Sequence, residues 1–87
     1  MKTQIDRIAE MEAAFDRVTL ALRSGLPLSP ATQADVEKLK NYYTTDWLSD
    51  FEADERGELP EGLKRGILSE DGIYDLLAAA NDMQNRK

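Results

Sequence analysis

The chain has 87 residues, a formal net charge of −6, and neither cysteine nor histidine. Its length predicts one domain with a thin core, because a chain of this size buries only about 60% of the surface that it exposes when unfolded. The missing residue types exclude disulfides, thiolate zinc sites, thiol nucleophiles and Ser-His-Asp triads, so we expect no catalytic residues, no cofactor and no metal site.

The negative charge is concentrated in one segment. Residues 46–61 contain seven acids and one base, whereas the rest of the chain contains ten acids and ten bases. Direct binding of a nucleic acid is not expected, because this segment would repel phosphates and no other segment forms a basic stripe. No apolar run approaches the roughly 20 residues of a membrane span, and the N-terminus lacks a signal-peptide core, so we expect no membrane association and a cytoplasmic location.

The first half of the chain has the pattern of two amphipathic helices. Apolar residues at spacings of three and four predict helices over residues 3–23 and 29–43. Between them, Gly25 and Pro27 favour a helix end, and a Ser-Pro pair favours a new start. The short link predicts an antiparallel helical hairpin over residues 3–43. The expected core positions are Ile8, Met11, Phe15, Val18 and Leu22, then Thr32, Val36, Leu39 and Tyr43.

The second half of the chain predicts two further helices. An acidic short helix ends near Gly57 and is followed by a turn-rich connector, the two spanning residues 46–68. Ser69 caps a final helix over residues 69–84. The expected inward residues are Trp47, Leu48 and Phe51 in the short helix, and Ile73, Leu76, Leu77, Ala80 and Met83 in the final one. We therefore predict an all-α fold, in which residues 1–87 form one small bundle of about four helices, the N-terminal hairpin and two shorter helices.

Several runs of residues are distinctive enough to compare with known families, and most of them lie from Tyr42 onward. They are Tyr42-Tyr43 and residues 47–55, 57–60, 63–71 and 74–77, and near the start of the chain Arg7-Ile8 and Met11-Glu12 add to them. Together these runs resemble a bacterial family, domain of unknown function 4298. The resemblance covers most of the chain and implies a small bacterial or phage-borne cytosolic protein. It implies no activity, cofactor or catalytic residue.

The acidic segment, residues 46–61, allows two functional hypotheses. Its charge can imitate a nucleic-acid backbone and so inhibit a DNA- or RNA-binding protein. Four of its acids also fall at ligand positions of an EF-hand loop, which suggests calcium or small-ligand binding at the acidic connector: Asp50, Glu52, Asp54 and Glu61. Against calcium, that loop needs a glycine where the chain has Glu55.

The basic residues of the connector allow two interpretations. Lys64 and Arg65 can bind a phosphate or carboxylate, because Gly66 lets a ligand approach the backbone. Alternatively, one of the two basic residues pairs with Asp50 or Asp54 and holds the connector against the short helix. We favour the pairing, because the glycine serves a turn equally well.

We expect a non-enzymatic protein that acts through protein–protein interaction or self-association. The thin core and the uninterrupted apolar face of the first helix favour a weak homodimer held mainly by that helix. The candidate interaction surface combines charged and aromatic side chains near the acidic segment, because tyrosine is frequent at interface hot spots. Its residues are Tyr42, Asp50, Asp54, Glu55, Lys64 and Arg65.

Overall fold

The computed structural model describes residues 3–85, which form an all-helical bundle without a strand. Its elements are α1 (Gln4–Ser24), α2 (Pro30–Thr44), α3 (Trp47–Glu55), the short 3-10 helix η1 (Gly66–Leu68) and α4 (Glu70–Asn85). The prediction of an all-α bundle of about four helices is confirmed. Of the two helices that were predicted to be shorter than the hairpin helices, α3 is shorter and α4 is not, because α4 has 16 residues and α2 has 15.

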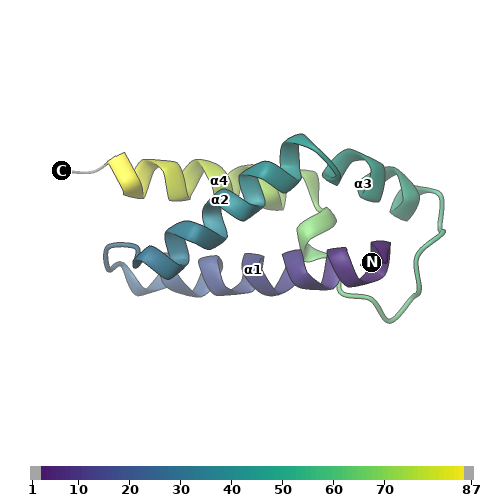
Figure 1. Cartoon of the computed structure of the whole chain (residues 1–87), viewed down its shortest axis with the longest axis horizontal. Helices are drawn as coiled ribbons and strands as arrows, with labels where there is room; N and C mark the ends of the chain where they lie inside the picture. The colour runs from purple at the N-terminus through teal and green to yellow at the C-terminus, as the bar shows by residue number, and fades with distance from the viewer. Residues whose placement is uncertain (1–2, 86–87) are drawn as a thin grey trace.

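The helices lie along one long axis, and the molecule measures 43 × 24 × 22 Å. Figure 1 shows α1, α2 and α4 side by side along this axis, with α3 at the end where α1 begins. The connector between α3 and η1 passes around that end, and η1 lies between α1 and α4. As a result, α1 packs against α2, α4 and η1.

Local signals set the ends of the helices. The Thr3 hydroxyl accepts from the Asp6 N–H at 3.1 Å, and the Thr3 N–H donates to the Asp6 carboxylate at 3.4 Å, which is a capping box. Gly25 ends α1 with φ = 72°, a left-handed conformation that glycine adopts without strain. Ser29 caps α2 by accepting the Thr32 N–H at 3.2 Å. The predicted break in the hairpin is therefore confirmed.

The connector after α3 holds one helical turn. Gly57 ends α3 with φ = 72°, and the next residues form a hydrogen-bonded turn from the Leu63 N–H to the Pro60 carbonyl at 3.2 Å. The helical turn of the connector is η1. Ser69 then caps α4 by accepting the Gly72 N–H at 3.2 Å, as predicted.

One apolar core runs the length of the bundle. Two core predictions need correction: Tyr42, not Tyr43, is the buried tyrosine, and Leu48 is 57% exposed. The inward line of α3 is Trp47, Asp50 and Ala53, so Leu48 lies about 100° away from Trp47 around the helix. The buried apolar residues are Ile8, Ala14, Val18, Leu28, Val36, Leu39, Tyr42, Trp47, Ala53, Leu59, Ile67, Leu68, Ile73, Leu76 and Ala80.

Candidate functional site

A buried carboxylate joins three helices at the end that holds α3. Asp50 is 0% exposed, and Arg7 of α1 donates two hydrogen bonds to it, from Nε to Oδ2 at 3.0 Å and from Nη2 to Oδ1. The Tyr42 hydroxyl of α2 donates to Oδ2 at 2.7 Å, and the Gln4 amide of α1 donates to Oδ1 at 2.9 Å. The start of α1, the end of α2 and the middle of α3 are thus bonded to one side chain.

The charges of this cluster are fixed by its own contacts. Burial alone would raise the pKa of Asp50, but the hydrogen bonds from Arg7, Tyr42 and Gln4 outweigh it and hold that pKa below its ordinary value. Burial and the bond to Asp50 raise the pKa of Tyr42, which stays a neutral donor. Neither Asp50 nor Tyr42 is expected to gain or lose a proton near neutral pH, so the cluster is suited to hold the three helices together rather than to transfer protons.

A second buried carboxylate fixes η1 against α1. Glu12 is 8% exposed, and its Oε2 accepts the Ile67 N–H at 2.7 Å. A Cβ atom added at Gly66 would lie 2.8 Å from Glu12 Oε1, so the Glu12 carboxylate would have to move. Glycine at position 66 therefore allows η1 to lie close to the Glu12 carboxylate, and this contact, rather than the approach of a ligand, accounts for the glycine.

The Trp47 side chain holds the other face of η1. Its Nε1 donates to the Ile67 carbonyl at 2.8 Å, so both backbone polar groups of Ile67 are bonded to side chains, one from α1 and one from α3. The Trp47 ring stacks on Phe51 with centroids 4.9 Å apart and meets Tyr43 at 5.2 Å in a tilted arrangement. These contacts make α3 and η1 one packed unit.

Arg65 organises the connector. Its Nε donates to Asp54 Oδ1 at 2.5 Å, which confirms the predicted pairing between the connector and α3. Its guanidinium also donates to four connector carbonyls at 2.7 to 3.4 Å: those of Leu59, Pro60, Glu61 and Leu63. A planar group with five donors suits this arrangement, because it satisfies several carbonyls of an irregular loop at once.

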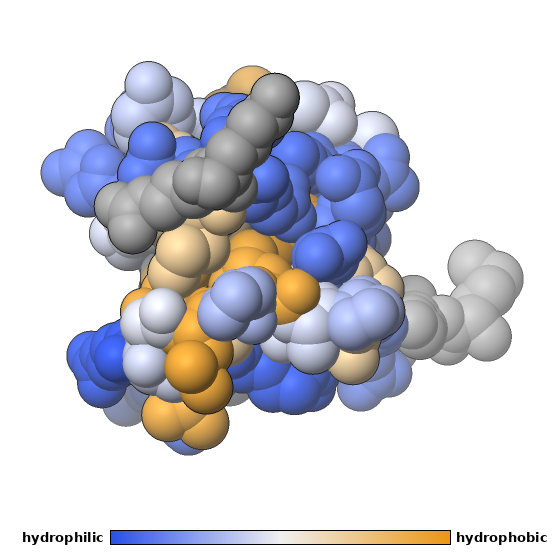
Figure 2. Space-filling view, turned by 90° about the vertical axis from the view of Figure 1, so that its left-hand side faces the viewer, coloured by the Kyte–Doolittle hydropathy of each residue, from blue (hydrophilic) through white to orange (hydrophobic). Residues whose placement is uncertain are grey.

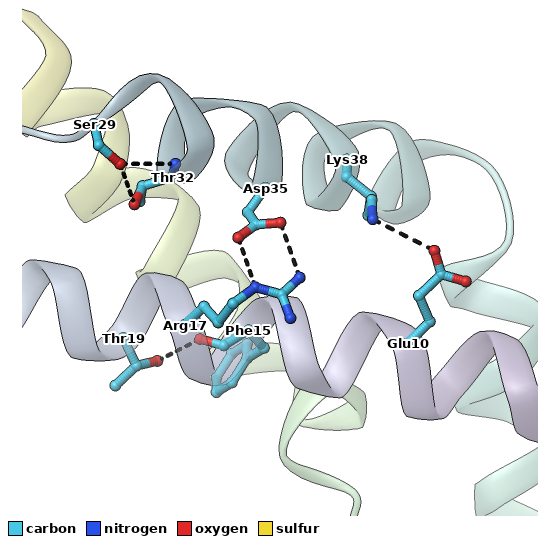
Figure 3. A network of polar contacts seen from close by, with 8 residues as sticks. All are labelled: Glu10, Phe15, Arg17, Thr19, Ser29, Thr32, Asp35 and Lys38. Carbon is cyan, nitrogen blue, oxygen red and sulfur yellow. Dashed lines mark hydrogen bonds and ion pairs between the residues drawn. The ribbon is translucent and has the colours of Figure 1, made fainter.

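Ion pairs also join α1 to α2 on the outside of the hairpin. Arg17 donates to both carboxylate oxygens of Asp35 at 2.8 and 3.0 Å, and Lys38 lies 3.4 Å from Glu10 (Figure 3). The hydrogen bond from Arg17 lowers the pKa of Asp35. The polar residues on this side of α1 are therefore used to hold α2.

The structure places the six candidate interaction residues in different environments. Tyr42 and Asp50 are 2% and 0% exposed, which corrects the expectation that they lie on a surface: the hydrogen-bonded cluster with Arg7 takes them inside. The other four stand at or near the surface. Asp54 and Arg65 are half-buried and bonded to each other, whereas Glu55 and Lys64 are exposed. Their role in an interaction stays a prediction.

The sequence interpretation missed the partners of these buried groups. Arg7 and Glu12 are not among the apolar positions that predict the core of the first helix, but Arg7 is half-buried and Glu12 is buried. Their partners lie 43 and 55 residues away along the chain. The only local signal was position: Gln4, Arg7 and Glu12 flank Ile8 on the side of α1 that faces the core.

Three of the four proposed calcium ligands are paired with arginines, one of them Glu52 with Arg56. Asp50 pairs with Arg7, and Asp54 pairs with Arg65. Between residues 3 and 85, no group of three or more acidic, histidine or cysteine side chains is arranged to hold a metal ion. Over the same span, no helix has the length and apolar character needed to cross a membrane.

Two hollows on the surface have linings that combine apolar and charged side chains. One, of about 280 Å³, lies between α1 and the connector and is lined by Ala9, Glu12, Ala13, Asp16, Gly62, Leu63 and Lys64. The other, of about 310 Å³, lies at the opposite end of the bundle and is lined by Leu22, Gly25, Ala79, Asp82 and Met83. Figure 2 views the molecule from that second end and shows apolar residues gathered where the α1–α2 loop meets the end of α4.

One comparison with known sequences gives a match. The sequence model of a family described as "Domain of unknown function (DUF4298)" matches residues 8–86. Neither the curated proteins nor the solved structures yield a match to this chain. Because the matched region covers nearly the whole sequence, the chain belongs to the DUF4298 family.

Proposed function

We propose that this protein acts without catalysis, by binding another protein through apolar surface that its own core leaves uncovered. The observation that carries the proposal is the exposure of large apolar side chains, which range from 43% to 72% exposed. They are Ile5, Leu20, Leu26, Leu48 and Tyr74. Exposed apolar groups on a small domain mark interaction sites when they lie together.

The apolar end of the bundle, which we define as Leu22, Leu26, Ala79 and Met83, is the candidate surface for a protein partner. Leu26 is 66% exposed and follows Gly25, which lines the hollow of about 310 Å³ together with the other three. A hollow lined in part by apolar side chains, with an exposed leucine nearby in the chain, suits an apolar side chain of a protein partner. Leu28, 8% exposed, anchors the loop that presents Leu26.

Inhibition by nucleic-acid mimicry has weaker support. Four of the seven acids of the segment 46–61 are engaged in ion pairs, because Arg7, Arg56 and Arg65 hold Asp50, Glu52, Asp54 and Glu58. Among residues 3–85, the side chains of the other three, Asp46, Glu55 and Glu61, make no ion pair. A short row of free charges attracts a basic cleft less strongly than a charge of −6 suggests.

Crosslinking in the native host tests the proposal. A photo-crosslinking residue at Leu26 should capture a protein partner, whereas the same residue at Leu48, which is 57% exposed on α3, should not. With the captured partner purified, Leu26→Glu should raise the Kd at least tenfold, because it places a charge in an apolar contact. Equal capture from both positions, or an unchanged Kd, would refute the assignment.

A further inference from the structure

The side of α1 that faces away from the core carries a strip of apolar and small residues that includes one acid, Asp16. Ile5 and Leu20 are 43% and 72% exposed, and Ala9, Ala13 and Asp16 between them are also exposed. At 3.6 residues per turn, these five positions fall within an arc of about 80°. We call this strip the outward face of α1. It is distinct from the polar sides that hold α2, α3 and η1.

A groove with two unpaired charges lies along this face, and three of the five residues of the face line it. Its α1 side is formed by Ala9, Glu12, Ala13 and Asp16, and its other side by residues 62–64 of the connector. Within residues 3–85, neither Asp16 nor Lys64 makes an ion pair or a hydrogen bond through its side chain, although both line the groove. The groove therefore offers one free acid and one free base beside an apolar strip.

We propose that a second copy of this chain docks on the outward face, with the two α1 helices antiparallel about a twofold axis between residues 12 and 13. In this arrangement Ile5 of each copy lies opposite Leu20 of the other, so the four large apolar side chains meet in two pairs. Asp16 lies opposite Ala9 of the other copy, at the groove that Lys64 lines. The small side chains of Ala9 and Ala13 allow the helices to approach closely.

The charges of the two copies complement each other in this arrangement. Asp16 of one copy faces Lys64 of the other, and the twofold axis repeats the contact. The two Asp16 side chains stay about 10 Å apart along the axis, close to the Debye length at physiological salt, so their repulsion is screened. The chain's net charge resides in residues 46–61, none of which lines the groove.

The size of the face sets the strength of the dimer. A helix of 21 residues is about 31 Å long and about 10 Å wide, so each copy buries about 300 Å². Stable interfaces bury about 800 Å² on each partner, which places this contact in the weak, transient class. This dimer is a form of the proposed interaction function, but it uses a different surface from the apolar end.

The first test is the concentration dependence of mass. Sedimentation equilibrium over roughly a hundredfold range of concentration should show a monomer–dimer equilibrium for the unchanged chain. Leu20→Glu should weaken the dimer at least tenfold, and the matched change Leu48→Glu should leave it unchanged. A constant monomer mass for the unchanged chain overturns the dimer, while the Leu26 crosslink still tests the protein partner separately.

The second test swaps the charges. Asp16→Lys and Lys64→Asp should each weaken the dimer severalfold, because each places like charges opposite each other in both contacts. Mixing the two variants should restore dimerisation, since every contact in the mixed pair then joins a lysine to an aspartate. Both positions are at the exposed groove, so both variants should fold. A mixture that stays monomeric overturns the antiparallel arrangement, as does a different protein that binds the outward face of a monomeric chain.

Discussion

Removing the positive charge beside Asp50 should reverse the pH dependence of stability. The change is Arg7→Met, which keeps the length of the side chain and leaves Asp50, at 0% exposure, without its cation. Breaking one side of a buried ion pair costs about 3–5 kcal/mol, and we expect about 3 kcal/mol because 29% of the Arg7 side chain is in contact with solvent. A domain of 87 residues has roughly 4–13 kcal/mol of total stability, so this loss is large.

The sign follows from the pKa of Asp50. In the unchanged protein this pKa is lowered, so the contribution of Asp50 to stability is present above the unfolded value of about 3.9 and is lost as the pH falls through the folded value. In Arg7→Met, burial dominates and raises the pKa of Asp50 above its unfolded value. The free energy of unfolding of the variant should therefore increase as the pH falls from 7 toward about 4. Asp50 gives the unchanged protein no such gain over this pH range.

Urea unfolding at neutral and acidic pH measures both effects. Trp47 is the single tryptophan and is 5% exposed, so its fluorescence reports unfolding without a label. Asp50→Asn is the control, because its side chain carries no charge to titrate, although its amide has one acceptor oxygen where the carboxylate has two. The reasoning is refuted if Arg7→Met loses less than about 1 kcal/mol, or if its stability decreases on acidification as in the unchanged protein.

Two further predictions concern η1 and the connector. Gly66→Ala should lower the free energy of unfolding by about 1–3 kcal/mol, measured by urea unfolding, because its Cβ displaces Glu12 from the Ile67 N–H. In a Glu12→Ala background the same change should cost much less. An equal cost in both backgrounds would contradict the contact. Arg65→Ala should lower the free energy of unfolding by about 1–3 kcal/mol, because it leaves Asp54 and several carbonyls without a donor. The neighbouring change Lys64→Ala should alter that free energy by no more than about 0.5 kcal/mol. Equal effects of the two changes in urea unfolding would contradict the role assigned to Arg65.

The helices and their ends could be predicted because their signals are local. Ser29, Gly25 and Ser69 act on backbone groups within a few residues, so a short window of sequence contains both partners. The pairing of Arg65 with Asp54 was also within reach, since the turn at Gly57 brings the connector back to α3 over a short stretch of chain.

The buried polar cluster could not be predicted for a physical reason. Helical periodicity identifies a core face by its apolar residues, and the inward line of α3 has Asp50 at its centre. The apolar pattern therefore selected Leu48, which is exposed. An acid at a core position becomes favourable only through a partner such as Arg7, 43 residues away, and no local spacing reveals such a partner.

The same distribution of contacts explains why binding and folding can be tested separately. α1 is fixed by α2, α4 and η1 through packing, and by α3 through Arg7. Its core-facing residues and polar residues such as Arg7, Glu12 and Arg17 are used in these contacts, and the outward face of α1 is the part that they leave uncovered. A partner docking there meets a helix that is already ordered, so association costs little conformational entropy. Substitutions on that face should therefore change affinity at constant stability, whereas substitutions at Arg7 or Gly66 should change stability first.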